Sequence, residues 1–229
     1  MNAITYQWIE PCPNERLRRA QELLKESVAA LGLENCLYPA GPAHVKFRDV
    51  LQFARERSPG RSFVWCNSDV RLTTDPYELD DGEMVRGFHR REVPSGELCT
   101  GVDMYLIPKT VWDAVLLKDA PDLWLGASHI DWWLTRAASL LGKYSSHAGY
   151  IDHETHPESA ASKSRKNPLM RHNVREYNRW ARRCGAATDD SRIFLPFVGE
   201  SSSPITDILR KAFGRKKASA PTESGGRQA

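Results

Sequence analysis

Short apolar runs alternate with apolar residues at helical spacing along the first part of the chain. The runs are rich in β-favouring types, and the spaced residues between them describe amphipathic helices. Asn14 is a suitable N-cap for the first helix, and Gly32 ends it. This alternation predicts a parallel α/β layer. The predicted strands are residues 3–9, 35–38 and 63–66, and the predicted helices are residues 15–31 and 47–57.

The third strand ends in a polar triplet. Its continuous apolar run has no helical spacing, which is typical of a strand buried on both faces of a sheet. Asn67, Ser68 and Asp69 follow it, and open α/β sheets bind ligands beyond the carboxyl ends of their strands. A carboxylate beside an amide and a hydroxyl suits a divalent cation shared with a diphosphate. The alternative is that the triplet only makes a turn.

The pattern continues more weakly after residue 80. Arg90, Arg91 and Glu92 are expected to lead from one strand into a loop. Residues 1–198 are predicted to form one domain, and residues 199–229 a basic, flexible tail. The further predicted strands are residues 84–89, 102–107 and 144–151, and the further predicted helices are residues 111–116, 130–141 and 170–181.

Composition narrows the class of protein. The 229 residues suffice for one sizeable domain, and a net charge of +3 does not by itself indicate nucleic acid. Five scattered cysteines without a Cys-x-x-Cys pair predict reduced thiols. The first residues lack a basic flank and an apolar signal core, and no apolar run reaches the length of a membrane span. We therefore expect a soluble, cytoplasmic protein.

Two acids stand at positions where an apolar residue or a simple loop would be expected. Asp103 follows Gly101 inside an apolar strand, so it should have a partner or face a cleft, unless it caps a neighbouring loop. Asp131 lies in the first turn of a predicted helix, where the helix dipole favours its ionised form. Trp132 beside it offers a flat wall for a sugar or base, although such residues are more often core.

A dense polar cluster follows the last predicted strand. Asp152, His153, Glu154 and His156 precede a proline. The histidines are three residues apart, whereas the helical zinc-protease pattern needs four, so one imidazole joining an oxygen-rich site is favoured. A surface turn without metal is the alternative.

In this order, the motifs resemble those of GT-A-type glycosyltransferases, which use nucleotide-diphosphate sugars. Residues 63–70 look like their strand ending in an Asp-x-Asp-type motif, here Asn-Ser-Asp. Residues 101–108 are similar to the later Gly-x-Asp strand, and residues 126–134 to the loop and helix that carry an acid near the acceptor. His153 or His156 would match the late histidine that completes a metal site in some members.

The resemblance implies a single α/β domain of the Rossmann-like GT-A class, with a mostly parallel sheet and helices on both faces. It implies transfer of a sugar from a nucleotide-diphosphate donor to an acceptor hydroxyl, the acceptor being a glycan, a lipid-linked glycan or a small molecule. Asp69, with His153 or His156, would hold Mn²⁺ or Mg²⁺ against the diphosphate. Asp131 would deprotonate or orient the acceptor, and Asp103 would hydrogen-bond the sugar or acceptor. The implied substrate-contacting residues are Asn67, Ser68, Gly101 and Trp132.

Two other functions fit parts of the sequence. A metal-dependent phosphohydrolase of nucleotide sugars would use the same acids and histidine. A nucleic-acid-binding module would use the Arg-rich helix over residues 171–183 and the basic residues 210–217, and its binding would weaken steeply with salt. No nucleic-acid motif accompanies those residues, so this function ranks lowest. The sequence leaves open the nucleotide, the sugar, the acceptor, the stereochemical outcome and the oligomeric state.

Overall fold

The computed structural model describes residues 2–12, 14–40, 44–127, 129–154 and 167–186. The predicted tail and His156 lie outside these residues. Within the described part of the chain, no helix has the length and apolar composition needed to cross a membrane.

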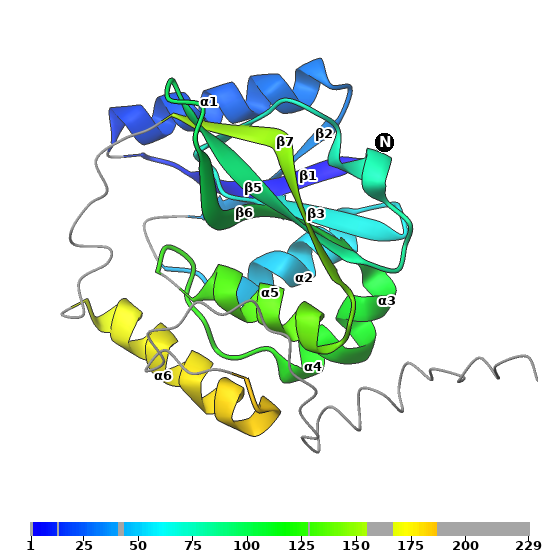
Figure 1. Ribbon diagram of the computed structural model, residues 1–229. Helices are drawn as coiled ribbons and strands as arrows, with labels where there is room; N and C mark the ends of the chain where they lie inside the picture. Colours follow the sequence, from blue (N-terminus) through cyan, green and yellow to red (C-terminus); the bar gives the residue numbers. More distant parts are fainter. Residues whose placement is uncertain (1, 13, 41–43, 128, 155–166, 187–229) are drawn as a thin grey trace, which may run out of the picture.

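Seven strands form one mixed sheet. Their spatial order is β2 (Glu34–Ala40), β1 (Ala3–Ile9), β3 (Ser62–Cys66), β6 (Leu98–Pro108), β5 (Val85–Val93), β7 (Tyr144–Glu154) and β4 (Val70–Leu72) (Figure 1). β1 is parallel to β2 and β3, and β5 is parallel to β7. β6 is antiparallel to both of its neighbours, and β4 is antiparallel to β7. Five strands therefore share one direction and two oppose it, which agrees with the predicted mostly parallel sheet.

Helices cover both faces of the sheet, as predicted. α1 lies on one face and the other helices lie on the opposite side (Figure 1). A short 3₁₀ turn over Pro76–Leu79 follows β4. The helices are α1 (Glu15–Ala30), α2 (Phe47–Arg57), a helical stretch made of α3 (Lys109–Val111), a π-helical turn (Trp112–Leu116) and α4 (Leu117–Asp119), then α5 (Ile130–Leu140) and α6 (Pro168–Cys184).

The central strand β3 explains why two cores form. All of its residues are buried, and their side chains alternate between the faces. Phe63 and Trp65 join the core under α2 and α5, while Val64 and Cys66 join the core under α1. The continuous apolar run recognised in the sequence is therefore a strand covered on both faces.

Local signals place α1 as expected. The Asn14 side chain accepts a hydrogen bond from the Leu17 amide at 3.3 Å, which satisfies one free donor of the first turn. Gly32 follows the helix with φ of 70°, a conformation that glycine adopts without steric cost. The chain then turns directly into β2.

The strand predicted over residues 84–89 is longer than expected and includes residues 90–92. These residues continue β5, where Arg90 pairs with Ile151 and Glu92 with His153 of β7. β7 likewise runs on through Glu154, so His153 lies in a strand and not in a turn. These residues gave no strand signal because they are polar and do not alternate with apolar residues. Backbone pairing with neighbouring strands nevertheless extends β5 and β7 through them.

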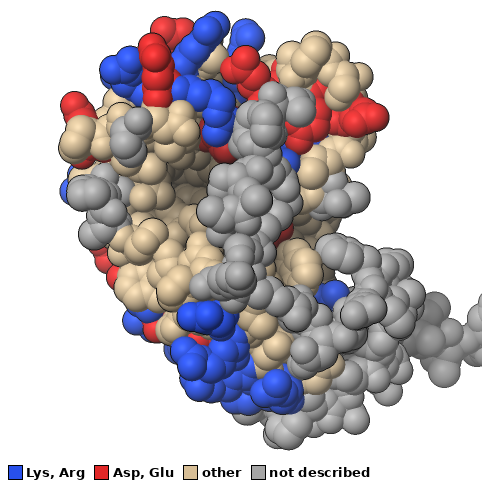
Figure 2. Space-filling model, turned by 90° about the vertical axis from the view of Figure 1, so that its left-hand side faces the viewer, with Lys and Arg blue, Asp and Glu red and all other residues tan. Residues whose placement is uncertain are grey.

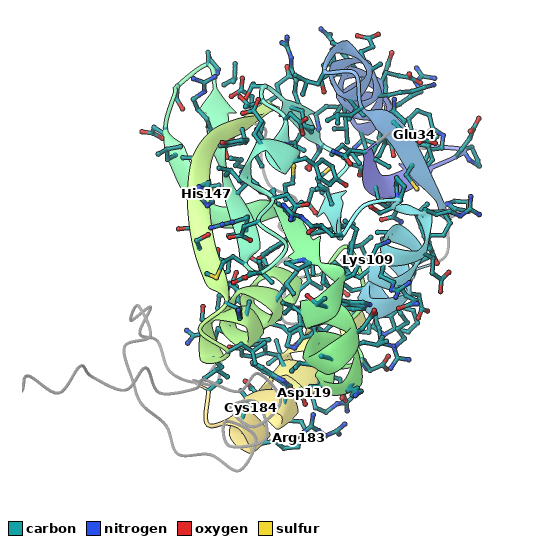
Figure 3. The ribbon with its side chains drawn as sticks, turned by 90° about the vertical axis from the view of Figure 1, so that its right-hand side faces the viewer. Glu34, Lys109, Asp119, His147, Arg183 and Cys184 are labelled. Carbon is teal, nitrogen blue, oxygen red and sulfur yellow. The ribbon has the colours of Figure 1, made fainter. Side chains whose placement is uncertain are left out.

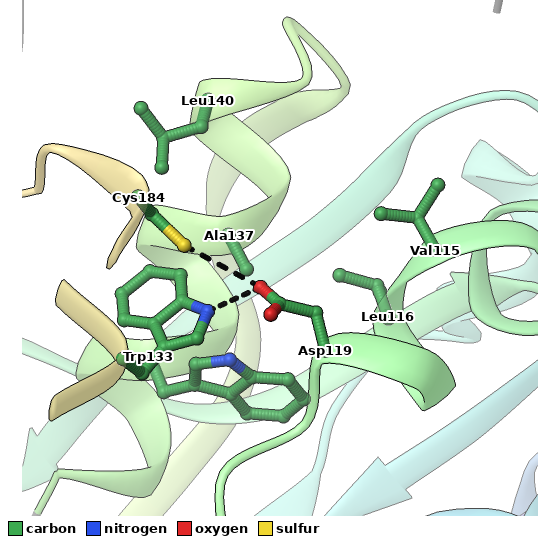
Figure 4. A pocket seen from close by; sticks show the side chains of 8 residues that line it. Val115, Leu116, Asp119, Trp133, Ala137, Leu140 and Cys184 are labelled. Atoms are coloured by element: carbon green, nitrogen blue, oxygen red, sulfur yellow. Dashed lines mark hydrogen bonds between the residues drawn. The ribbon is translucent and has the colours of Figure 1, made fainter. Parts of the chain in front are cut away.

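α6 is fixed to the rest of the domain by polar side chains as well as by its apolar face. The amide of Asn173 bonds the backbone of Trp124 through both its oxygen and its nitrogen. The Trp180 indole donates to Asp119 at 2.5 Å, and the Cys184 thiol lies 3.5 Å from the same carboxylate, beside a small pocket (Figure 4). Figure 3 shows Asp119 and Cys184 at the lower end of the molecule. The helix is thus held at both ends.

Candidate functional site

Strand register brings the predicted polar residues to one edge of the sheet. Asn67 follows β3 directly, and its backbone amide donates to the Asp103 carbonyl at 2.8 Å. β4 then pairs with β7 so that Val70 stands opposite His153. Asp69, one residue before Val70, is thereby placed beside His153. Asp69 and His153 are more than eighty residues apart in the chain, and they meet here because β4 pairs with β7.

Asp69, His153 and Glu92 form a connected row. His153 Nε2 lies 3.5 Å from Asp69 Oδ2, and His153 Nδ1 lies 2.8 Å from Glu92 Oε2. Burial opposes ionisation of Asp69, but His153 and Arg90 outweigh it, so the pKa of this carboxyl lies below its usual value. Burial likewise opposes ionisation of Glu92, whose pKa His153 and Arg90 nevertheless lower to about 2. Both carboxylates are ionised at neutral pH.

Arg90 links this row to the next acid. Its Nε donates to Glu92 at 2.6 Å and its guanidinium donates to Asp103 at 2.9 Å. Burial opposes its charge, yet Asp103 and Glu92 raise the pKa of Arg90 above its ordinary value. Sequence reasoning missed Arg90 and Glu92 as site residues. Only their two-residue spacing, which puts both on one face of a strand, could have indicated them.

Asp103 has the partners that its position in an apolar strand requires. Besides Arg90, the Asn67 side-chain amide donates to its Oδ1 at 2.5 Å. The side chain is nine per cent exposed. Burial, with a contribution from the charge of Asp69, raises the pKa of Asp103, and Arg90 opposes this. Asn67 therefore acts as a donor to an acid, a role that a carboxylate at its position could not fill.

Asp131 is held at the start of α5 on the same side of the sheet. The Tyr105 hydroxyl, two residues beyond Asp103 on the same face of β6, donates to the Asp131 backbone carbonyl at 2.9 Å. Burial is the main cause that raises the pKa of Asp131 to about 6, and the charge of Asp103 adds to it. The residue keeps partial exposure. Asp131 thus has a carboxyl group whose pKa lies near neutral pH, and the residue is partly accessible to solvent.

The backbone entering α5 is strained. His129 adopts φ of 81°, the left-handed region that non-glycine residues rarely occupy. Its ring is buried and lies 4.7 Å from the Trp132 ring and 5.2 Å from the Tyr177 ring, centroid to centroid. This packing pins a conformation that costs about 1–2 kcal/mol. The strained residue lies two positions before Asp131 and sets where the helix begins.

The other predicted site residues, Ser68, Gly101 and Trp132, show fewer features expected of a binding site. Ser68 is in the partly exposed turn between β3 and β4. The Gly101 carbonyl lies 3.2 Å from His89 Nδ1, and a Cβ at Gly101 would meet only Cys99 Sγ at 3.6 Å, so space does not demand glycine there. Trp132 packs between α5 and α6 and is partly exposed, which leaves one part of its ring for a ligand.

Two side chains of this cluster, Asp69 and His153, are of types that bind divalent cations. Among the described residues, four carboxylates, Asp69, Glu92, Asp103 and Asp131, lie in this cluster together with Arg90 and His153. Adjacent ligands of a small cation stand about 3 Å apart when each lies about 2.1 Å from it, and Asp69 and His153 come within 3.5 Å. The described residues contain no group of three or more acids, histidines or cysteines arranged to hold a metal. Within the described part of the chain, Asp69 and His153 are a pair that could contribute to a metal site, and a metal held there would need further ligands from elsewhere.

The face of the molecule toward which the carboxyl ends of the parallel strands point is hollowed. Figure 2 shows this face, with a hollow in the tan surface between charged residues above and basic residues below.

Comparisons with known proteins give fold neighbours only. No family model and no curated protein matches the chain. A glycosyltransferase involved in glycosylation of the major capsid of PBCV-1 matches at 16% identity over 68% of this chain and 93% of its own, with a TM-score of 0.46. The apo form of the glycosyltransferase GlyE from Streptococcus pneumoniae TIGR4 matches at 14% identity over 84% of this chain and 66% of its own, with a TM-score of 0.38.

A nucleotidyltransferase is also among these neighbours. The inositol-1-phosphate CTP transferase from T. maritima matches at 8% identity over 76% of this chain and 77% of its own, with a TM-score of 0.36. At such identities and scores, none of these matches carries weight for the activity. The structural neighbours are glycosyltransferases and a nucleotidyltransferase, the class of protein that the sequence motifs resemble.

Proposed function

We propose that this protein is a glycosyltransferase that moves a sugar from a nucleotide-diphosphate donor to an acceptor hydroxyl. One observation carries the proposal: Asp69, Asp103, Asp131 and His153, from four separate segments, converge at the carboxyl edge of the sheet. A fold alone would not justify the activity. The argument rests on what each of these groups can do to a pyrophosphate and a sugar.

Asp69 and His153 would hold Mn²⁺ or Mg²⁺ against the donor diphosphate. The cation would neutralise the charge that develops on the departing nucleoside diphosphate. Glu92 accepts from His153 Nδ1 and so leaves Nε2 directed toward Asp69. A carboxylate behind a metal-binding histidine fixes its tautomer and its ring orientation.

Asp131 would take the proton of the acceptor hydroxyl or orient that hydroxyl. A general base works best when its pKa lies near the working pH, and the pKa of Asp131 is raised to about 6. Asp103, fixed by Arg90 and Asn67, would present its carboxylate to sugar hydroxyls. Trp132, Gly101 and Ser68 would complete the walls of the site.

A thermal-shift screen tests this function. Nucleoside diphosphates and nucleotide sugars are added with and without Mn²⁺, and stabilisation is expected only when nucleotide and metal are present together, because ligand binding to the folded state raises its stability. Absence of stabilisation by every nucleotide with Mn²⁺ would reject the proposal.

Product analysis distinguishes the proposed transferase from a phosphohydrolase. In a phosphohydrolase, Asp131 would activate water instead of an acceptor hydroxyl. The stabilising nucleotide sugar is incubated with the protein and Mn²⁺, and the products are analysed. Cleavage of the sugar–phosphate bond releases nucleoside diphosphate, as transfer requires. Release of nucleoside monophosphate and sugar phosphate would show a phosphohydrolase instead.

Glu92→Gln is expected to weaken Mn²⁺-dependent nucleotide binding by roughly 10- to 100-fold, the typical cost of losing an outer partner of a metal ligand. The glutamine can still meet His153, but it lacks the charge that fixes the ring and that pairs with Arg90. Calorimetry with and without Mn²⁺ measures the effect, and binding without metal should not change. Glu97→Gln, an exposed position between β5 and β6, is the matched control. Equal affinities in the two variants would contradict this role.

A further inference from the structure

The exposed face of α6 carries five arginines within about a third of the helix circumference. They are Arg171, Arg175, Arg179, Arg182 and Arg183, and all are exposed. At 100° per residue, Arg171, Arg175 and Arg182 fall within about 40° of one another and span about 16 Å along the helix. We call these three the arginine stripe. Its side chains therefore face one direction.

The arginine stripe has no acidic partner among the described residues. Arg179 is paired with Glu176 at 2.8 Å, and Arg183 lies 3.6 Å from Asp119. Arg171, Arg175 and Arg182 make no such pair. Burying three like charges in a row on one helix would be unfavourable, and even in solvent they repel one another. An external set of anions would remove that repulsion.

The packing of α6 against the domain determines the direction in which the arginine stripe faces. The opposite side of α6 is buried through Tyr177, Trp180 and Cys184, and the helix is held to α4 by the Trp180–Asp119 hydrogen bond. Figure 2 shows basic side chains gathered at the lower rim of the face that contains the hollow. Because α6 lies at the lower left of Figure 1, on the side that Figure 2 turns toward the viewer, the arginine stripe and the hollow lie on one side of the molecule.

We infer that the arginine stripe docks this protein on an anionic lipid surface. The three guanidinium groups are too far apart to converge on one phosphate, but they match a plane of separate phosphates. Leu98 and Val93, the large apolar side chains that the described residues leave exposed, stand at the tip of the β5–β6 hairpin. That tip projects from the edge where β5 ends, which is the edge of the candidate site. Basic and apolar groups at the rim of one face are typical of proteins that lie on a membrane surface.

Nucleic acid fits this surface less well. Proteins that bind single strands combine basic grooves with exposed aromatic rings on which bases stack. The aromatic residues of α6, Tyr177 and Trp180, are each 1% exposed and face the core. The stripe therefore offers contacts to phosphates, while Tyr177 and Trp180 of the same helix offer no platform for bases.

Vesicle co-sedimentation of the full chain tests the inference. Wild type is expected to bind vesicles of equal parts phosphatidylcholine and phosphatidylglycerol, and not vesicles of phosphatidylcholine alone. The triple variant Arg171→Gln/Arg175→Gln/Arg182→Gln is expected to bind the anionic vesicles roughly 100-fold more weakly, since each basic residue near an anionic leaflet strengthens binding about fivefold. The control Lys25→Gln/Arg48→Gln/Arg57→Gln removes the same charge from exposed positions of α1 and α2.

The control variant should keep wild-type binding. Equal losses in both triple variants would show that net charge alone matters and would overturn the inference. Equal binding of wild type to both vesicle types would overturn it as well. A labelled single-stranded oligonucleotide, followed by fluorescence anisotropy, should not bind more tightly than the vesicles. If it does, and the stripe variant loses that binding, the partner is nucleic acid and the lipid inference is wrong. Circular dichroism confirms that both variants are folded.

Discussion

Asp131→Asn is expected to lower turnover of the nucleotide sugar by roughly 100- to 10,000-fold, the usual contribution of a general base, and at the same time to stabilise the fold. The loss of turnover follows because asparagine cannot take a proton. The gain in stability follows because the ionised carboxyl of Asp131 is disfavoured by burial and by Asp103. Release of nucleoside diphosphate measures the first effect, and thermal unfolding measures the second.

The pH dependence gives the sign of the stability effect. The pKa of Asp131 is raised to about 6 in the folded protein, above the ordinary value of 3.8 for an aspartate. The folded state therefore binds the proton more tightly, and stability falls as pH rises from about 4 through about 6. A shift of this size is worth about 3 kcal/mol, or roughly 6–12 °C in a domain of 150–250 residues. The variant should regain that amount at neutral pH, and its advantage should shrink toward pH 4.

Asp113→Asn provides the control with the opposite sign. Asp113 pairs with Arg55 at 2.6 Å, and this partner lowers the pKa of its carboxyl. Its replacement should cost stability at neutral pH and leave turnover unchanged. An Asp131→Asn variant with normal turnover would remove Asp131 from the mechanism, and one without added stability would contradict the assigned burial cost.

Asp69→Asn is expected to weaken Mn²⁺-dependent nucleotide binding by more than about 100-fold, beyond the loss typical of an outer partner. Asparagine keeps the shape of the side chain but lacks the charge that a hard cation requires. His153 would lose its nearest carboxylate at Nε2 and keep Glu92 at Nδ1. Titration calorimetry with the nucleotide selected in the screen, with and without Mn²⁺, measures the change.

Asp152→Asn is the matched control for this experiment. Asp152 precedes His153 in β7, so its side chain points to the other face of the strand, and it pairs with Arg91 at 2.8 Å. Its loss should leave metal-dependent binding intact. If Asp69→Asn and Asp152→Asn bind nucleotide and Mn²⁺ equally well, the metal role of Asp69 is wrong.

Most elements of the fold could be predicted because local physics favours them strongly. The apolar run of β3 and the caps of α1, Asn14 and Gly32, carry their structure in a few adjacent residues. The polar ends of β5 and β7 carried no such signal. Arg90 and Glu92 are strand residues because β7 pairs with them, through Ile151 and His153.

The residues of the candidate site likewise fall into those that the sequence indicates and those that only strand pairing brings into place. Asp69 and Asp103 stand out in the sequence because each interrupts or ends an apolar strand, and burying a carboxylate without a partner is costly. The partners themselves, Arg90 for Asp103 and Glu92 for His153, could not be found that way. Each is an ordinary surface-type residue until strand register places it against an acid or an imidazole.

The sequence by itself determined the alternating layers, the buried central strand and the acids that end or interrupt its strands, since hydrophobic period and residue type are local properties. Only the tertiary structure decided which acid meets which base. Pairing of β4 with β7 sets Asp69 beside His153, and pairing of β5 with β7 sets Glu92 behind it. Those contacts join segments about 60 to 85 residues apart, and their register depends on backbone hydrogen bonds that leave no local trace in the chain.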